Sequence, residues 1–496
     1  MTGTLYGVGL GPGDPELMTV KAARLISEAS VIAYHCARHG RSIARSVAEP
    51  YLREGQIEEK LVYPVTTETT DHPGGYEGAI ADFYELSAKR LAEHLDADRD
   101  VVLLCEGDPF FYGSYMYMHE RLSGRFEAVV VPGVTSVSAA SSVLGRPLVQ
   151  RDEVLTVLPG TLPAPELARR LADTDAAAVL KLGRTFSSVR EAFAEAGKLD
   201  DAVYVERATW GQQRIEPLAS VDPSTVPYFS LALLPSPAYA ARVSPAPEVP
   251  AVPVPGGEVV VVGLGPAGPE WLTPEAASEL DAAEHIVGYG PYVARVPQKA
   301  GQQRHASGNR VEADRAREAL SLASAGSRVA VVSSGDPGVF AMASAVLEQV
   351  SAGHGAGVRV RIVPGVTAAQ AAASRVGAPL GHDYCVLSLS DRLKPWEIIE
   401  KRLDAAGAAD LVLALYNPAS RTRTTQLASA REVLLRHRSE ETPVVVARDV
   451  GGPEEDIRIT TLGELDPSTV DMRCLLIVGS SKTRAENGIV WTPRSY

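Results

Sequence analysis

The feature that most constrains this 496-residue chain is that its second half repeats its first. Three blocks recur in the same order, and the spacing between the blocks differs between the two copies. This pattern indicates a duplicated domain whose loops have diverged in length, and it excludes a solenoid of short repeats. The paired blocks are GLGPGDPELMT at 9–19 and GLGPAGPEWLT at 263–273, GDPFFYG at 107–113 and GDPGVFA at 335–341, and VPGVTSVSAASSVLGRPL at 131–148 and VPGVTAAQAAASRVGAPL at 363–380.

A segment rich in proline and alanine, residues 235–257, separates the two copies. Proline at this density disfavours both helix and sheet and leaves an extended, semi-rigid spacer. We therefore predict a first domain over residues 1–236, a linker over 237–256 and a second domain over 257–496. The first copy is longer between its first two blocks, and we expect the extra residues to form loops within 34–75.

Short apolar runs alternate with helical segments in both halves, which is typical of an α/β domain with a mostly parallel sheet. Thr19 and Thr273 stand where each glycine-rich turn meets a helix, and both are candidate N-caps. The expected strands are 4–8, 101–105 and 178–181 in the first half and 259–263, 329–333 and 411–416 in the second, and the expected helices are 19–27 and 273–280.

Charge and composition exclude several functional classes. The net charge is −13, and an acidic chain without a basic block is a poor candidate for binding nucleic acid. No apolar run approaches the roughly 20 residues of a membrane-spanning helix, and the N-terminus does not resemble a secretory signal. The four cysteines and ten histidines show no metal-ligand spacing. We expect a cytoplasmic protein that binds no metal, membrane or nucleic acid.

The glycine-rich turn of the second copy, Gly263-x-Gly265-x-x-Gly268, matches the fingerprint of dinucleotide-binding folds. However, Pro266 and Pro269 remove backbone N–H donors that a pyrophosphate needs, and two prolines do the same in the first copy. A nicotinamide enzyme is therefore disfavoured. Two interpretations remain open, a tight turn that only brings backbones close and a turn that binds another ligand.

Two further motifs follow strands in both copies. Asp108 and Asp336 lie in Gly-Asp-Pro turns at the carboxyl ends of strands, where open parallel sheets bind ligands. Each aspartate is either a ligand acceptor or a helix cap. Thr135 and Thr367 lie in Pro-Gly-Val-Thr sequences before helices rich in small residues, and each is either a cap or a ligand contact.

Basic residues cluster at 38–45 and 421–423, and also at Arg392 and Lys394. A solvated surface is one interpretation. Recognition of carboxylates is the other, because the guanidinium group matches a carboxylate in bidentate geometry.

Taken together, the blocks GLGPGDPELMT, EGDPFFYG, VVPGVTSVSAASSVLGRPL and LKLG resemble the tetrapyrrole methylase family. These are class III S-adenosylmethionine-dependent methyltransferases of corrinoid and sirohaem synthesis. The first half resembles the precorrin-2 C20-methyltransferases in YGVGLGPGDPELMTVKA, HCARHGRSIA and LCEGDPFFYGSYMYMHERL. The second half resembles the precorrin-3B C17-methyltransferases in VVVVGLGPAGPEWLTPEA, VVSSGDPGVFAMASAVLE, LALYNPASRTR and VVVARDVGGPEEDI.

The resemblance implies two tandem units, each with two α/β lobes that hold S-adenosyl-L-methionine between them and release S-adenosyl-L-homocysteine. It also implies a homodimer. By motif, the first cofactor site would use Pro12, Glu106, Gly107, Asp108, Phe111, Thr135, Ser136, Leu182 and Ala208, and the second Pro266, Ser334, Gly335, Asp336, Val339, Thr367, Ala368, Asn417 and Val450.

The implied reactions are methylation of precorrin-2 at C20, giving precorrin-3A, and methylation of precorrin-3B at C17 with ring contraction, giving precorrin-4. The cobalt-containing equivalents, and a chain in which only one half is active, are the alternatives. Loss of a proton accompanies attack by a ring carbon, so a proton acceptor is useful. Asp14 is the candidate in the first half, unless it only bonds the backbone of its turn, and Gly268 stands at that place in the second.

Overall fold

The computed structural model describes residues 2–38, 40, 42–65, 70, 72–150, 153–237, 257–308, 311–392 and 394–493. The predicted linker, apart from its first residue, lies outside this part of the chain, as does part of the insertion expected within 34–75. Packing divides the chain into two compact units, Met1–Thr135 and Ser136–Tyr496. This boundary falls inside the first sequence repeat, so the domain limits drawn from the repeat stay a prediction.

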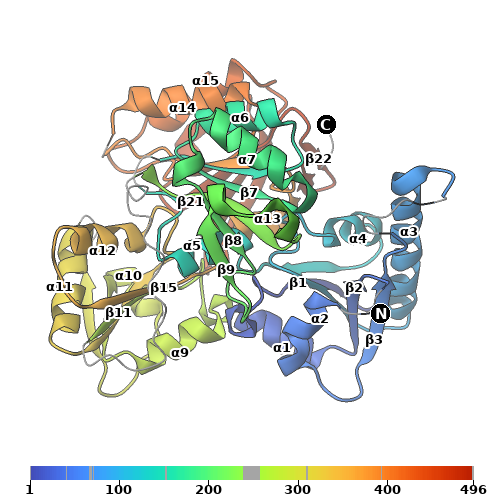
Figure 1. Ribbon diagram of the computed structural model, residues 1–496, viewed down its shortest axis with the longest axis horizontal. Helices are drawn as coiled ribbons and strands as arrows, with labels where there is room; N and C mark the ends of the chain where they lie inside the picture. The colour runs from blue at the N-terminus through green and yellow to red at the C-terminus, as the bar shows by residue number, and fades with distance from the viewer. Residues whose placement is uncertain are drawn as a thin grey trace. The chain divides into compact units, whose positions relative to one another are not determined.

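The first unit is a parallel sheet of five strands in the order β3-β2-β4-β1-β5 (Figure 1). Val8 of β1 packs into one core with helices α1 and α2. The neighbouring Gly7 faces the other side, where a Cβ would lie 2.3 Å from the ring of Tyr115 on α4. The elements are β1 (Leu5–Gly9), η1 (Pro15–Leu17), α1 (Val20–Glu28), β2 (Val31–Cys36), α2 (Ile43–Ala48), η2 (Glu49–Tyr51), β3 (Ile57–Val62), α3 (Gly75–Asp96), β4 (Val101–Cys105), α4 (Tyr115–Leu122) and β5 (Ala128–Val131).

The second unit contains a second parallel sheet with the same strand order, β13-β12-β14-β11-β15. Helices α9 and α10 cover one of its faces, and α11 and α12 cover the other. Its elements are β11 (Glu258–Gly263), η7 (Pro269–Trp271), α9 (Pro274–Ala282), β12 (His285–Tyr289), α10 (Gly290–Arg295), β13 (Gln303–Ser307), α11 (Glu312–Ser324), β14 (Arg328–Ser333), α12 (Met342–Ser351) and β15 (Arg359–Val363).

Both predicted helix caps are confirmed. The Thr19 hydroxyl accepts the backbone N–H of Ala22 at 3.2 Å and begins α1, and the Thr273 hydroxyl accepts the N–H of Ala276 at 3.1 Å and begins α9. The predicted strands are found to within two residues, and β4 coincides with the predicted 101–105. The parallel sheet expected early in each half is therefore present in both.

A ten-stranded sheet in the second unit joins the later parts of the two repeats, in the order β20-β19-β21-β18-β17-β6-β7-β10-β8-β9. Its central pair, β17 and β6, is antiparallel, and five strands from each repeat follow outward in matching order. The repeats thus meet as the two copies of a two-fold dimer do. The strands are β6 (Leu155–Pro159), β7 (Ala176–Leu180), β8 (Val203–Glu206), β9 (Arg214–Pro217), β10 (Ser230–Leu234), β17 (Tyr384–Ser388), β18 (Val412–Tyr416), β19 (Pro443–Arg448), β20 (Asp456–Thr461) and β21 (Cys474–Val478).

Two ion pairs cross this junction between the repeats. Arg170 and Asp383, both buried, pair across it, and Arg402 Nη2 lies 2.8 Å from Asp175 Oδ2. Helices α6 and α7 cover the first repeat's strands and α14 and α15 cover the second's. The remaining elements are α5 (Ser136–Leu144), α6 (Ala164–Ala172), η3 (Gly183–Thr185), α7 (Phe186–Glu195), η4 (Leu199–Asp201), η5 (Leu218–Ser220), η6 (Pro223–Thr225), α13 (Ala368–Val376), β16 (Gly377–Ala378), α14 (Trp396–Ala408), α15 (Gln426–Leu435), η8 (Pro467–Thr469), β22 (Arg484–Glu486) and β23 (Ile489–Trp491).

Among the described residues, none of the helices combines the length and the apolar character needed to cross a membrane. The same part of the chain contains no group of three or more His, Cys, Asp or Glu side chains placed to hold a metal ion.

Candidate functional site

Three loops meet at the carboxyl ends of the parallel strands in the second unit. The glycine-rich turn after β11 and the Gly-Asp-Pro loop after β14, residues 334–340, are tied by a pair of backbone hydrogen bonds. Gly335 N donates to Gly265 O at 2.8 Å, and Gly265 N donates to Gly335 O at 3.2 Å. The third loop, with Gly365, follows β15. The motifs that the sequence separates by many residues are therefore brought together.

Asp336 fastens the second loop to the third. Its Oδ1 accepts the N–H of Gly338 at 2.8 Å and its Oδ2 accepts the N–H of Gly365 at 3.2 Å. The side chain is 3% exposed. The aspartate therefore organises the loops through backbone amides rather than capping the following helix. A ligand contact at its carboxylate stays a prediction.

The first unit contains the same construction. Gly107 N donates to Gly11 O at 2.8 Å, and Gly11 N donates to Gly107 O at 3.2 Å. Asp108 accepts the N–H of Phe110 at 2.9 Å through Oδ1 and the N–H of Gly133 at 3.1 Å through Oδ2. The duplicated sequence thus forms one loop geometry twice.

The glycines of these loops differ in what surrounds them. A Cβ on Gly365 would lie 2.4 Å from Gly335 O, and one on Gly133 would lie 2.1 Å from Gly107 O, so only glycine lets the backbones approach. Gly335 and Gly107 have φ angles of +67° and +66°, and a Cβ on either would have no atom nearer than 3.8 Å. Beside Gly107 there is therefore open space, and beside Gly335 there are only ordinary van der Waals contacts, so the loop after β4 has room for a bound small molecule at the strand ends.

Burial changes the protonation of both aspartates. Desolvation raises the pKa of Asp336 to about 6 and the pKa of Asp108 to about 7, although the amide donors partly offset it. In the folded chain each carboxyl thus holds its proton at a higher pH than in the unfolded chain.

A pH dependence of stability follows for Asp336. Because its pKa is raised from 3.8 to about 6, its contribution to the free energy of unfolding is full below pH 3.8 and is lost as the pH rises through about 6. The variant Asp336→Asn has no ionisable carboxyl group at this position, so its stability does not include this pH-dependent contribution. We expect the stability of the wild type relative to this variant to fall by about 2 kcal/mol between pH 4 and pH 7. Denaturant unfolding of both proteins across this range measures the difference, and a difference that does not change with pH contradicts the prediction.

Residues with positive φ that are not glycine recur at equivalent places in the two repeats. One pair lies in the Gly-Asp-Pro loops, and two pairs directly follow strands of the ten-stranded sheet. Strained backbone of this kind concentrates at functional sites. The predicted residues Leu182, Asn417, Ala208 and Val450 lie at or directly after these positions. The pairs are Tyr112 (55°) and Phe340 (49°), Lys181 (60°) and Asn417 (52°), and Arg207 (46°) and Asp449 (50°).

In the second repeat, Tyr416 at the end of β18 contacts both α13 and the Gly-Asp-Pro loop. Its hydroxyl accepts the N–H of Ala369 at 3.2 Å and bonds the Thr367 side chain, while its ring lies 5.5 Å from that of Phe340. Thr367 also caps α13 by accepting the N–H of Gln370 at 3.2 Å. The cap expected of Thr367 is confirmed, and its ligand contact stays a prediction. Sequence reasoning missed Tyr416, although it directly precedes the predicted Asn417.

The other predicted residues of the second site surround the same loops. Asn417 donates to the Ser388 hydroxyl at 3.0 Å. Val450 is buried beside Gly451, where a Cβ would lie 2.7 Å from Nε1 of Trp271. Pro266, Ser334 and Ala368 are half-buried and Val339 is buried. Their positions bring the predicted set of the second repeat into one region.

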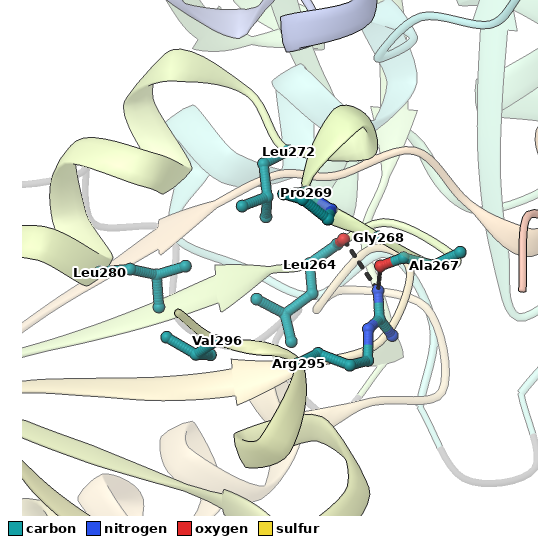
Figure 2. A pocket seen from close by; sticks show the side chains of 8 residues that line it. All are labelled: Leu264, Ala267, Gly268, Pro269, Leu272, Leu280, Arg295 and Val296. Atoms are coloured by element: carbon teal, nitrogen blue, oxygen red, sulfur yellow. Dashed lines mark hydrogen bonds between the residues drawn. The ribbon is translucent and has the colours of Figure 1, made fainter. Parts of the chain in front are cut away.

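Arg295, which sequence reasoning also missed, holds the glycine-rich turn from one side (Figure 2). Its guanidinium donates to the carbonyls of Leu264 at 3.0 Å, Gly265 at 2.8 Å and Ala267, and to the Ser334 hydroxyl at 3.1 Å. Figure 2 shows it lining a small pocket beneath that turn. The sequence signal that could have identified Arg295 is its place at the end of a short helix, α10, that directly follows the largely buried strand β12.

Arg295→Met should lower the free energy of unfolding by about 3 kcal/mol, because several carbonyls lose a charged donor. Arg317→Met removes an exposed arginine from α11 and should change the stability by less than about 0.5 kcal/mol. Denaturant unfolding followed by tryptophan fluorescence compares the two variants. Equal stabilities would show that the turn does not depend on Arg295.

The predicted residues of the first site divide between the two units. In the first unit, Pro12 is half-buried, Phe111 and Thr135 are buried, and Glu106 is exposed, with Oε1 accepting the N–H of Ala44 at 3.1 Å. In the second unit, Ser136 begins α5, and Leu182 and Ala208 are buried. Gly107 and Asp108 hold the loops as described above.

Asp14 begins the short helix η1, where its Oδ1 accepts the N–H of Glu16 at 2.9 Å. The interpretation that it bonds the backbone of its turn is therefore confirmed, and its role as a base stays a prediction. Gly268 begins η7 at the equivalent place.

Some residues of the basic clusters form ion pairs or hydrogen bonds with other groups of the protein itself. Arg45 forms a bidentate pair with Glu58 at 2.8 and 2.9 Å. Arg423 is 4% exposed and donates to Asn417 O at 3.1 Å, so it holds its own loop. Arg38, Arg392 and Arg421 are exposed. Only such exposed members suit the binding of carboxylates.

Comparison with known proteins covers almost the whole chain. The family model of tetrapyrrole (corrin/porphyrin) methylases matches residues 4–222 and 258–466. The cobalamin biosynthesis protein CobIJ of Mycobacterium tuberculosis is 60% identical over 502 residues, which cover 100% of this chain and 96% of that protein.

Two relatives each match about half of the chain. The precorrin-2 C(20)-methyltransferase of Sinorhizobium sp. is 51% identical over 234 residues, which cover 47% of this chain and 95% of that protein. The precorrin-3B C(17)-methyltransferase of Sinorhizobium sp. is 47% identical over 247 residues, which cover 48% of this chain and 97% of that protein.

Proposed function

Because the chain belongs to the tetrapyrrole (corrin/porphyrin) methylase family, and is thus a methyltransferase with S-adenosylmethionine as its methyl donor, we propose that each half catalyses its own methylation. The first half methylates precorrin-2 at C20, and the second methylates precorrin-3B at C17 with contraction of the ring. The observation that carries this proposal is that two single-function relatives with these names each match about half of the chain.

The loops described above suit a methyl donor. When bound, S-adenosylmethionine supplies an activated methyl group on a sulfonium. Gly107 has open space beside it, and a Cβ on Gly335 would meet no atom nearer than 3.8 Å; both glycines lie beside backbone groups that the buried Asp108 and Asp336 hold in place. The protein's task is then to orient the donor and the acceptor carbon and to exclude water, which fixed loops at the ends of strands do well.

The chain's own residues differ between the two reactions. In the first half, Asp14 is proposed to accept the proton that the ring carbon releases, because its carboxylate is fixed at the glycine-rich turn. In the second half, Gly268 stands there, so a different group must accept the proton. Exposed arginines such as Arg421 are proposed to pair with the acidic side chains of the tetrapyrrole.

Mass spectrometry of the products tests the proposal. The full-length chain is incubated with S-adenosylmethionine and either precorrin-2 or precorrin-3B, each prepared with and without cobalt. We expect each metal-free acceptor to gain the mass of one CH2 unit, because a methyl group replaces a proton on the ring. Methylation of the cobalt forms alone would replace the proposed substrates by their cobalt equivalents, and methylation of one acceptor alone would restrict the activity to one half. If no acceptor gains mass, the proposal is wrong.

On the same resemblance, we also propose that the protein forms a homodimer and is located in the cytoplasm. Light scattering coupled to size exclusion tests the first. A mass of twice 52.6 kDa supports a homodimer, and 52.6 kDa contradicts it.

A further inference from the structure

Helix α5 belongs to the first sequence repeat, yet it packs against the second. We call residues 136–149, which comprise α5 and the residues up to Val149, the bracing segment. The hydroxyl of Ser142 on α5 donates to the carbonyl oxygen of Ile362 on β15 at 2.6 Å. This bond fixes the helix on the parallel sheet of the second repeat.

The end of the bracing segment pairs with the backbone of the Gly-Asp-Pro loop. Val149 N donates to Gly338 O at 3.3 Å, and Val149 O accepts the N–H of Phe340 at 3.4 Å. Phe340 is one of the residues with positive φ. The backbone of Val149 thus bonds the residues on both sides of Val339, and these two bonds stabilise the strained turn at Phe340.

Ser138, on the buried side of α5, reaches the aspartate of the same loop. Its side chain is hydrogen-bonded to Asp336, and both residues are 3% exposed. The packing is close, since a Cβ on Gly338 would lie 3.1 Å from Ser141 Oγ. The small residues of α5, including Ala139 and Ala140, permit this approach.

We infer that the bracing segment of the first repeat positions the Gly-Asp-Pro loop of the second, with Ser138 as a positioning residue that acts through Asp336. The functional consequence of this inference rests on the proposed function. The first repeat then contributes to the affinity of the second repeat for the methyl donor of the C17 reaction. Nothing in sequence reasoning links these segments, which lie about 200 residues apart.

Kinetics of Ser138→Ala in the full-length chain test the consequence, with Ser87→Ala as the matched control. Ser87 is an equally buried serine on α3 of the first unit. We expect the KM for S-adenosylmethionine to rise about tenfold in the C17 reaction, which equals about 1.4 kcal/mol, while its kcat stays within about twofold. The C20 reaction and the control should be unchanged. An equal effect on both reactions, or none, overturns the inference.

Hydrogen exchange at the amides of residues 338–340 tests the bracing itself without any activity. We expect Ser138→Ala and Ser142→Ala each to speed this exchange about tenfold relative to Ser87→Ala, because each removes a bond that holds the segment or the loop. Unchanged exchange in both variants overturns the inference. Failure of the proposed function looks different, because the wild type would then methylate neither acceptor while the exchange would still respond to these substitutions.

Discussion

Asp336→Ala strongly reduces methylation of precorrin-3B and leaves methylation of precorrin-2 intact, and Asp108→Ala has the reverse effect. In each repeat the aspartate accepts two backbone N–H groups from two loops, and alanine leaves both amides buried without an acceptor. Each unsatisfied amide costs about 1–3 kcal/mol, and the two together cost about 2–6 kcal/mol, which corresponds to a loss of about 30-fold or more in kcat/KM. Initial rates with each acceptor, measured on the same preparation, give the two values.

Exposed aspartates supply the controls for this experiment. Asp82 lies on α3 of the first unit and Asp314 on α11 of the second, and alanine at either should leave both rates within about twofold. If Asp336→Ala reduces both methylations equally, or neither, the assignment of one reaction to each repeat is wrong.

Gly365→Ala should reduce methylation of precorrin-3B by about 10- to 100-fold, and Gly133→Ala should do the same for precorrin-2. The added Cβ would lie 2.4 Å from Gly335 O in the first case and 2.1 Å from Gly107 O in the second. Two backbone segments must then separate, and such overpacking costs about 1–3 kcal/mol. The loop that carries the aspartate moves with them.

The matched controls are Gly308→Ala in the second unit and Gly124→Ala in the first. Neither glycine has an atom within 4 Å of an added Cβ or a positive φ, so alanine should fit without strain. Rates for Gly365→Ala that equal those for Gly308→Ala would show that the close approach of these backbones is not needed for activity.

Much of the fold follows from local sequence. The β-branched run of β4, the threonine caps and the repeated glycine-rich turns are local signals, and the structure forms each where the pattern places it. The gathering of the Gly-Asp-Pro and Pro-Gly-Val-Thr motifs also follows, because parallel strands bring their carboxyl ends to one edge of a sheet.

The partners of particular side chains could not be predicted in this way. The two carboxylate oxygens of Asp336 bond amides from two loops, and Arg295 bonds carbonyls of a turn about 30 residues away. Such contacts depend on the relative placement of loops, which no local pattern specifies. The bond from Ser138 to Asp336 further requires that one repeat pack on the other.

The number of methyl-donor molecules bound per chain tests the account most directly. Equilibrium dialysis of labelled S-adenosylmethionine against the full-length protein should give two molecules per polypeptide, and Asp336→Ala should leave one. One molecule or none bound to the wild type would contradict a chain in which each repeat binds its own donor.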